Sequence, residues 1–185
     1  MTYAINPHSS WQALDSAASL EPDPRISGLI REVARHMEAE IKGQLEPLMA
    51  TLTSEPIYHF WGNGNPMVLQ GRDAVAGFYS GMFSTGRQQF EVVVEKVIAS
   101  PQNVVTEGHV KQVNRGRDLK AMGMTKVGEE SIEEDDLWLS DAQLVTVWPA
   151  DGKSKLVGED IYFGVNPMQT LRRISKADLP PYYQL

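Results

Sequence analysis

Residues 55–66 read Glu55-Pro-Ile-Tyr-His-Phe-Trp-Gly-Asn-Gly-Asn-Pro66, and they are followed by Met67-Val-Leu-Gln-Gly71 and by an amphipathic segment from Arg72 to Phe83. This pattern predicts an aromatic strand, a turn of Gly, Asn and Pro, a second short strand and a helix. Neighbouring side chains of a strand point to opposite faces. Whichever face is turned inward, Tyr58 to Trp61 therefore bring ring surface together with a hydroxyl or a protonatable group. Such a wall is typical of a pocket for an apolar ligand with one polar group.

Helical signals precede this segment. We expect a short helix at residues 11–20, where apolar positions recur at helical spacing. Asp23-Pro24 is a strong helix start, because Asp is a favoured N-cap and Pro suits the first helical position. Apolar residues then recur at intervals of three and four from Ile26 to Leu45, which predicts a helix with one core-facing stripe. A separate turn or short helix is expected from Pro47 to Leu52, since Pro weakens a helix interior.

Strand signals fill the second half of the chain. Residues 89–99 show alternating polarity, and residues 104–113 are their expected hairpin partner. Two further strands are expected at residues 144–148 and 156–163, on either side of a turn. The connection from Asn114 to Asp141 is long, and such loops are often lids or binding elements. Helices followed by antiparallel strands predict an α+β fold, in which a curved, mainly antiparallel sheet wraps round N-terminal helices.

The length and composition fit one globular domain. A chain of 185 residues is long enough to bury a full core, and 42% hydrophobic and 22% charged residues are ordinary values. Within the single domain 1–185, we expect an N-terminal extension with a short helix (1–23), the α+β body (24–164) and a C-terminal tail (165–185).

Charge and hydropathy exclude several classes of protein. The formal net charge of −7 argues against a nucleic-acid partner, because a phosphate backbone attracts basic surfaces. No apolar run approaches the about 20 residues that a membrane span needs. The N-terminus lacks the basic start and apolar core of a signal peptide, so a cytoplasmic protein without a membrane partner is expected. The acidic residues between Glu129 and Asp136 are interpreted as a solvated loop.

Familiar cofactor and metal motifs are missing from the sequence. It contains no Cys, which removes disulfides, thiol nucleophiles and Cys-based metal sites. It also contains no G-x-G-x-x-G before a helix, no Walker-type lysine loop, no H-E-x-x-H and no G-x-S-x-G. Nothing spaces His and acidic residues for a metal. We therefore expect neither a cofactor nor a metal.

His59 is the first candidate for acid–base chemistry, since a His titrates near neutrality. A purely structural role fits the sequence around His59 equally well. In that role, a backbone carbonyl would hold the histidine in the core or at the rim of the core. Glu107 and His109 lie two apart on one expected strand and so share a face. If that face is inward, the carboxylate orients the imidazole and supports its charged form. If that face is outward, both side chains are solvated. The outward orientation is favoured, because antiparallel sheets commonly have one solvated face. His36 lies beside the apolar helix stripe and is expected to be structural.

Glu159 is the more suspicious of two neighbouring acids on the last expected strand. Glu159 and Asp160 point to opposite faces of that strand. The Glu159 face also carries Val157, Ile161 and Phe163, and therefore resembles core. An acid on an apolar face is a functional candidate, because its burial is costly without a purpose or a partner.

Aromatic side chains are candidates for the walls of a ligand pocket, although each alone also fits an ordinary core position. With four Trp and eight Met, the composition favours a hydrophobic ligand. The candidate substrate-binding residues are Tyr58, Trp61, Tyr79, Phe83, Trp138, Trp148 and Tyr162.

Together, the helix pair, the Tyr-His-Phe-Trp-Gly run at 58–62, the segment Gly71 to Phe83 and the paired strands resemble the SnoaL-like polyketide cyclases. These belong to a superfamily of cone-shaped α+β barrels that also holds nuclear transport factor 2, scytalone dehydratase and ketosteroid isomerase. The similarity covers roughly residues 24–164. It implies that the strand of His59 faces the cavity. Relatives often keep a carboxylate directly after the position of His59, where this chain has Phe60.

The resemblance therefore implies that His59 is the principal general base or acid, with Glu107, His109 or Glu159 as other sources of a base. It implies a cofactor-independent lyase or isomerase that acts on a small aromatic or polycyclic compound. Dehydration, a proton shift beside a carbonyl, ring closure and retro-aldol cleavage are all within reach, including loss of formaldehyde from a lignin-derived diaryl diol. The alternative is a non-catalytic module of the same fold that binds a hydrophobic ligand or dimerises.

A homodimer paired through the outer sheet face is also expected. Relatives commonly associate in this way. The expected strands at 92–97 and 144–148 have apolar residues on both faces, which an antiparallel sheet seldom shows unless both faces are covered.

Overall fold

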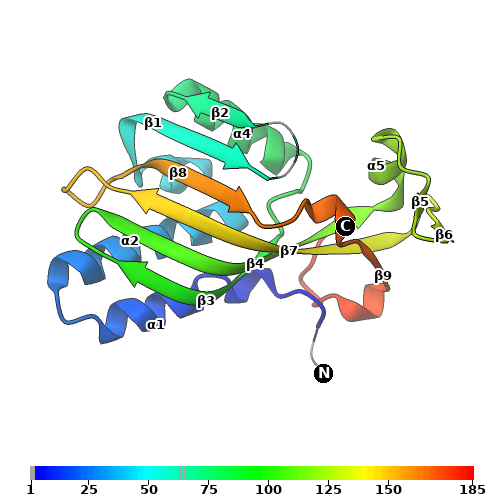
Figure 1. Ribbon diagram of the computed structural model, residues 1–185, viewed down its shortest axis with the longest axis horizontal. Helices are drawn as coiled ribbons and strands as arrows, with labels where there is room; N and C mark the ends of the chain where they lie inside the picture. Colours follow the sequence, from blue (N-terminus) through cyan, green and yellow to red (C-terminus); the bar gives the residue numbers. More distant parts are fainter. Residues whose placement is uncertain (1–2, 63, 65) are drawn as a thin grey trace.

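A curved, seven-stranded sheet forms the centre of the computed structural model, which describes residues 3–62, 64 and 66–185 (Figure 1). Its strands are β1 (Leu52–Trp61), β2 (Met67–Gln70), β3 (Glu91–Ala99), β4 (Asn103–Arg115), β7 (Leu137–Pro149), β8 (Leu156–Phe163) and β9 (Arg172–Ile174). They lie in the order β2-β1-β8-β7-β4-β3, and β9 pairs with β7. All pairs are antiparallel except β1 with β8, which are parallel. The expected α+β class and mainly antiparallel sheet are confirmed, and the sheet does not close among the described strands.

Helices cover one face of this sheet, which we call the inner face. They are α1 (Gln12–Leu20), α2 (Pro24–Ile41), α3 (Leu45–Met49) and α4 (Arg72–Ser84). A further helix, α5 (Gly116–Ala121), lies at one end of the sheet (Figure 1), and short 3-10 turns are η1 (Pro7–Ser9), η2 (Pro167–Gln169) and η3 (Lys176–Asp178). The helix start at Asp23-Pro24 is confirmed, since the Asp23 side chain accepts a hydrogen bond from the Arg25 N–H at 2.9 Å. None of the described helices is long and apolar enough to cross a membrane.

The main core lies between α2 and the inner face. Leu29, Val33 and Met37 of α2 are buried in one cluster with residues of β1, β4, β7 and β8, including Tyr58 and Trp148. From Ser140 onward in β7 and from Glu159 to Tyr162 in β8, burial largely alternates, which gives these parts one core face and one outer face. This alternation decides which candidate side chains reach the interior.

The segment between β4 and β7 was expected to be one long connection, and this prediction is wrong. β4 continues to Arg115, and α5 and two short paired strands, β5 (Lys126–Val127) and β6 (Glu130–Ser131), follow before β7 begins at Leu137. These short elements project from one end of the sheet, opposite the turn between β7 and β8 (Figure 1). They were missed because two-residue strands and a six-residue helix are too short to show a hydrophobic period.

Gly158 permits a close approach of β8 to β1. The pairing of these strands shifts register between Leu52 and Ile57, and Gly158 lies opposite Ile57. A Cβ atom at position 158 would lie 1.7 Å from the Ile57 carbonyl oxygen, and the φ angle of Gly158 is 153°. Glycine is therefore required here both for space and for backbone conformation. Because Glu159 follows directly, this contact also sets the position of the buried acid.

Gly158→Ala should lower the free energy of unfolding by about 1–3 kcal/mol, because the added methyl group overpacks the β1–β8 contact. Chemical denaturation monitored by circular dichroism measures the change. Gly77→Ala is the matched control, since it lies in α4 and a Cβ atom added there would meet no described atom within 4 Å. That control should be neutral or stabilise by up to about 1 kcal/mol. Equal stability of the wild type and Gly158→Ala would contradict the prediction.

Candidate functional site

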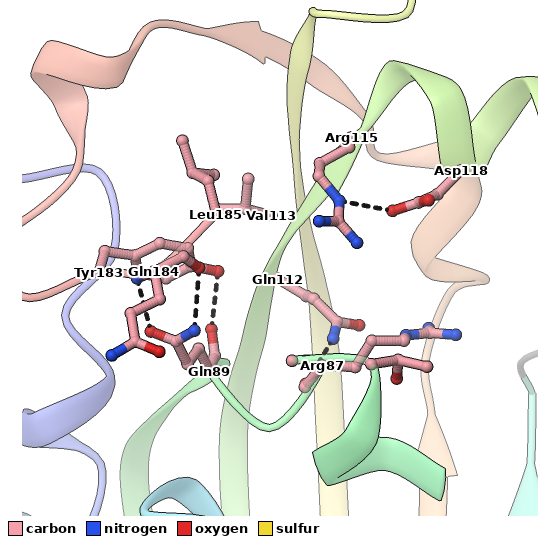
Figure 2. A pocket seen from close by; sticks show the side chains of 11 residues that line it. Arg87, Gln89, Gln112, Val113, Arg115, Asp118, Tyr183, Gln184 and Leu185 are labelled. Carbon is pink, nitrogen blue, oxygen red and sulfur yellow. Dashed lines mark hydrogen bonds and ion pairs between the residues drawn. The ribbon is translucent and has the colours of Figure 1, made fainter.

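A cavity of about 650 Å³ lies between α2, α4 and the inner face of the sheet. This volume is within the range of small-molecule sites. Its wall is largely apolar and aromatic, and includes Phe60, Phe78, Phe90, Trp148, Ile161 and Phe163. A smaller pocket of about 170 Å³ adjoins the cavity and shares Thr85, Arg87 and Gln112 with it (Figure 2).

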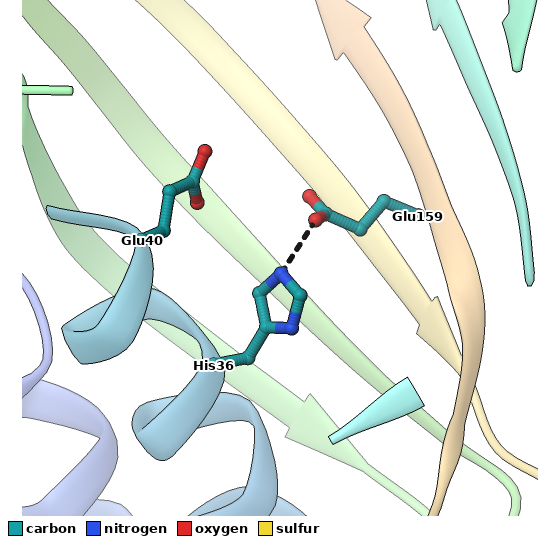
Figure 3. A group of neighbouring side chains, drawn as sticks. All are labelled: His36, Glu40 and Glu159. Atoms are coloured by element: carbon teal, nitrogen blue, oxygen red, sulfur yellow. Dashed lines mark ion pairs between the residues drawn. The ribbon is translucent and has the colours of Figure 1, made fainter. Parts of the chain in front are cut away.

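A group of polar side chains meets at the side of the cavity where α2 faces β8 (Figure 3). His36 and Glu40 are one helical turn apart on α2 and so project from the same face. Figure 3 shows both side chains directed toward Glu159 of β8. Tyr58 of β1 and Tyr79 of α4 complete the group, which we call the buried cluster. His36 is 0% exposed and Glu159 is 5% exposed, so water reaches neither side chain freely.

Thr51 fixes the orientation and the tautomer of His36. The Thr51 hydroxyl donates to the Leu48 carbonyl oxygen at 2.6 Å and lies 2.6 Å from His36 Nδ1. A hydroxyl has one proton to donate, so Thr51 Oγ1 must accept a hydrogen bond from Nδ1–H. The other ring nitrogen, Nε2, therefore faces the rest of the buried cluster.

His36 Nε2 faces two hydroxyls and a carboxylate. It lies 3.2 Å from Tyr79 Oη, 3.3 Å from Tyr58 Oη and 3.1 Å from Glu159 Oε1. The Tyr79 hydroxyl also donates to Glu159 Oε1 at 3.0 Å. A protonated His36 balances the charge of Glu159, and a neutral His36 accepts a hydrogen bond from a tyrosine. The His36 imidazole and the Tyr79 hydroxyl can therefore both supply hydrogen bonds to the Glu159 carboxylate.

Burial shifts the protonation of the neighbouring acids. Loss of hydration, and secondly the negative charge of Glu159, raise the pKa of the Glu40 carboxyl well above its usual value. The same two causes raise the pKa values of the Tyr58 and Tyr79 hydroxyls well above the usual range. Both tyrosines therefore remain hydrogen-bond donors at neutral pH, and Glu40 is biased toward its protonated form beside Glu159.

The buried cluster also contains a set of side chains that could hold a cation. His36, Glu40 and Glu159 each offer one ligand atom, and these atoms lie within 4.8 Å of one another. One imidazole and two carboxylates suit a divalent transition metal. The sequence spacing did not reveal this set, because the ligands come from α2 and β8, which are distant in the chain.

Several predicted site residues do meet around the cavity. Glu159, Tyr79 and Trp148 line it, and Tyr58 lies behind them in the hydrogen-bonded cluster. Phe83 packs against Tyr79, with a distance of 5.9 Å between ring centroids. Their roles in substrate binding remain predictions, whereas their common location follows from the packing of α4 and the strand alternation.

His59 does not face the cavity as expected. It lies on the outer face, where Nδ1 is 2.7 Å from Asp160 Oδ1 and the ring stacks on Trp61. Trp61 in turn stacks on Tyr162, which is 43% exposed. The physical reason is strand alternation: Tyr58 points inward, so its neighbour His59 must point outward. His59, Trp61 and Tyr162 were expected in the cavity wall, and this prediction is wrong, because all three lie on the outer face.

The other displaced candidates lie farther from the cavity. Glu107 pairs with Lys96 at 2.9 Å, and His109 Nδ1 lies 3.1 Å from Asp141 Oδ1, both on the outer face. This is the solvated orientation, one of the two that the sequence allows. Trp138 is 1% exposed, but it is buried at the far end of β7 in a separate cluster with Leu119 of α5.

His36 and Glu40 were missed, although the sequence carries a signal for them. Both residues lie on the long helix, and their spacing of four places a histidine and an acid on one helix face. His36 was assigned a structural role because its neighbours Val33 and Met37 are apolar. His36 is fully buried and Glu40 lines the cavity, so the pair links a core histidine to an acid of the cavity.

Solved structures share this fold. A SnoaL-like protein from Shewanella putrefaciens CN-32 has a TM-score of 0.61 at 13% identity, over 92% of this chain and 94% of that one. A SnoaL-like protein from Jannaschia sp. CCS1 has a TM-score of 0.55 at 20% identity, over 78% and 90% of the two chains. An LEH-like epoxide hydrolase of M. tuberculosis has a TM-score of 0.54 at 18% identity, over 77% and 87%. At these identities the likeness shows the fold alone.

A comparison with curated proteins finds no match. Residues 33–134 match the model of the SnoaL-like domain. The matched segment is more than half of the chain and includes His36, Glu40, Tyr58 and Tyr79, although it ends before β8. Together with the mixed sheet and its inner cavity, this match shows that the chain belongs to the SnoaL-like domain family.

Proposed function

We propose that the protein is a cofactor-independent acid–base enzyme, a lyase or an isomerase, that acts on a small aromatic or polycyclic compound. The observation that carries this proposal is the buried cluster at the end of an apolar cavity of about 650 Å³. An enzyme of this kind needs a base, a proton donor and a site that excludes water.

Glu159 is the proposed proton-transfer residue, because its carboxylate both lines the cavity and contacts the His36 imidazole. Tyr79 also lines the cavity, and its protonated hydroxyl is the proposed donor to an oxygen that becomes negative during the reaction. His36 is fully buried behind these groups and is the proposed positioning residue, which holds Glu159 and compensates its charge.

Glu40 is the proposed acid partner of Glu159. Two carboxyl groups that share a small site favour opposite protonation states, since both cannot be charged at low cost. Burial, and secondly the charge of Glu159, raise the pKa of the Glu40 carboxyl and so favour the protonated form that an acid requires. A base and an acid then face one substrate from two different elements, α2 and β8.

One candidate reaction is the retro-aldol-like loss of formaldehyde from a lignin-derived diaryl diol. Glu159 would take the proton of the primary hydroxyl, and the carbon–carbon bond to that carbinol would break to release formaldehyde. The electron pair would form the new double bond and expel the second hydroxyl, protonated by Glu40, as water. The aromatic wall, including Phe60, Phe78 and Trp148, suits the two rings of such a substrate.

Glu159→Gln should lower kcat about a hundred- to ten-thousand-fold, because positioned proton transfer contributes about that factor. Turnover is measured on a panel of aromatic ketones, diols and polyketides without added cofactor. Asp160→Asn is the matched control, since it removes the neighbouring acid, whose side chain pairs with His59 on the outer face. Asp160→Asn should retain near-normal kcat.

Three outcomes would contradict this assignment. Near-normal turnover by a folded Glu159→Gln variant would remove Glu159 from the reaction. Activity that a chelator abolishes and one metal restores would instead assign His36, Glu40 and Glu159 to a metal site. Tight binding of panel compounds without any turnover would favour the non-catalytic ligand-binding module.

Glu40→Gln should change how stability depends on pH. A carboxyl with a raised pKa in the folded state keeps a proton there that the unfolded chain has released above about pH 4.3. Stability therefore falls as pH rises from the unfolded pKa through the folded one. Glutamine cannot ionise, so the melting temperature of the variant should rise relative to that of the wild type as the pH increases above the unfolded pKa of about 4.3.

The exposed Glu46 of α3 provides the control for this experiment. Glu46→Gln should shift the melting temperature by a similar small amount at every pH. A constant difference between Glu40→Gln and the wild type over the whole range would show that Glu40 is ionised in the folded protein.

We further propose that the protein is a homodimer paired through the outer sheet face. Trp61 and Tyr162 stack there at 4.6 Å between ring centroids, and Val68 of β2 is 58% exposed. Exposed apolar groups that gather on a sheet face favour a protein interface.

Light scattering at micromolar concentration should give the mass of a dimer, and Tyr162→Glu should shift the population toward the monomer. The introduced carboxylate would lose its hydration inside an interface and so weaken it, whereas on an exposed surface it would stay hydrated. Leu20→Glu is the control, because Leu20 is 84% exposed at the end of α1. A monomeric wild type would refute the proposal.

A further inference from the structure

We propose that the open end of the cavity carries a subsite for the carboxylate of an aromatic acid, formed by Arg87, Arg115 and Gln112. This inference deepens the proposed function, because it names the class of substrate that the cavity would select. It depends on the proposed use of the cavity, but its test does not depend on catalysis.

The first observation is that the smaller pocket continues the main cavity. Thr85, Arg87 and Gln112 line both spaces, so the two spaces meet at these residues. Thr85 and Arg87 are exposed, which places the junction at the open end. The smaller pocket, at about 170 Å³, has room for a substituent but not for a ring system of its own.

The second observation is the charge of the smaller pocket. Its charged side chains among the described part of the chain are those of Arg87, Arg115 and Asp118, so two guanidinium groups stand beside one carboxylate. The whole chain carries a formal charge of −7, so cationic side chains are the minority in the molecule but not at this pocket. Such a site attracts an anion and disfavours a cation.

The third observation is that hydrogen-bond donors remain available there. Within the described residues, the Arg87 guanidinium makes no ion pair, while Arg115 uses Nε to contact Asp118 at 2.8 Å. Figure 2 shows the terminal nitrogens of Arg115 directed toward Gln112 and Arg87. Gln112 Nε2 donates to the Arg87 carbonyl oxygen at 2.8 Å and so holds the Arg87 segment in place.

These donors favour a carboxylate over other polar groups. A guanidinium presents parallel N–H groups that match the two oxygens of a carboxylate. The apolar part of the ligand would extend past Arg87 into the aromatic cavity, toward Phe78 and Phe90. The combination of an aromatic cavity and a cationic end selects an aromatic acid.

Two probes of nearly equal shape test the subsite. Calorimetry compares the Kd of biphenyl-4-carboxylate with that of biphenyl-4-carboxamide. The wild type should bind the carboxylate about tenfold or more tightly, since a hydrogen bond to a charged group contributes at least that factor. Arg87→Ala should reduce the preference to within about twofold, and Arg87→Lys should retain part of it.

Lys153→Ala is the charge-matched control, because Lys153 lies in the turn between β7 and β8 at the opposite end of the sheet. It should keep the full preference. Equal affinity of the wild type for the two probes, no binding of the carboxylate, or an unchanged preference in a folded Arg87→Ala variant would each overturn the subsite. Neither probe has a bond for the enzyme to break, so failure of the proposed reaction would leave this result unaffected.

Discussion

The burial of the Glu159 carboxylate in an apolar hollow is the constraint on which the site depends. A charge in such a place is costly unless a counter-charge and hydrogen bonds surround it. Here the imidazole of His36 lies 3.1 Å from Glu159 Oε1, and the hydroxyl of Tyr79 donates a hydrogen bond to the same oxygen. His36 lies on α2 and Tyr79 on α4, so both helices must pack over the sheet beside Glu159. The need to compensate one buried charge therefore constrains the placement of two helices.

The same demand links stability to chemistry. Thr51, in the connection between α3 and β1, holds the far side of the His36 ring, so the tautomer is set outside the cavity. Glu40 then experiences a site in which one carboxylate is already present, and the cost of a second charge keeps its proton in place. Neighbouring groups that differ in protonation are a common basis for acid–base catalysis. Burial of each of these polar groups is unfavourable for folding. Together, however, they form a set of the kind that proton transfer requires.

Much of the fold could be predicted from the sequence, because its signals are local. Asp23-Pro24 starts a helix for reasons contained in two residues, and the apolar neighbours of Glu159 marked its face as core. The face of β1 that points inward could not be predicted in this way, since alternation gives two equivalent choices until the strand is paired. Tyr58 rather than His59 reached the interior. The partnership of His36 with Glu159 is likewise a product of tertiary packing.

The parallel pairing of β1 with β8 sets two matched pairs side by side: Tyr58 opposite Glu159 on the inner face, and His59 opposite Asp160 on the outer face. A shift of β8 by one residue would exchange the faces of all its side chains. An aspartate would then enter the hollow and a glutamate would leave it, together with the apolar residues that line the wall. Point substitutions can therefore tune this site during evolution, but an insertion or deletion within β8 would dismantle it in a single step.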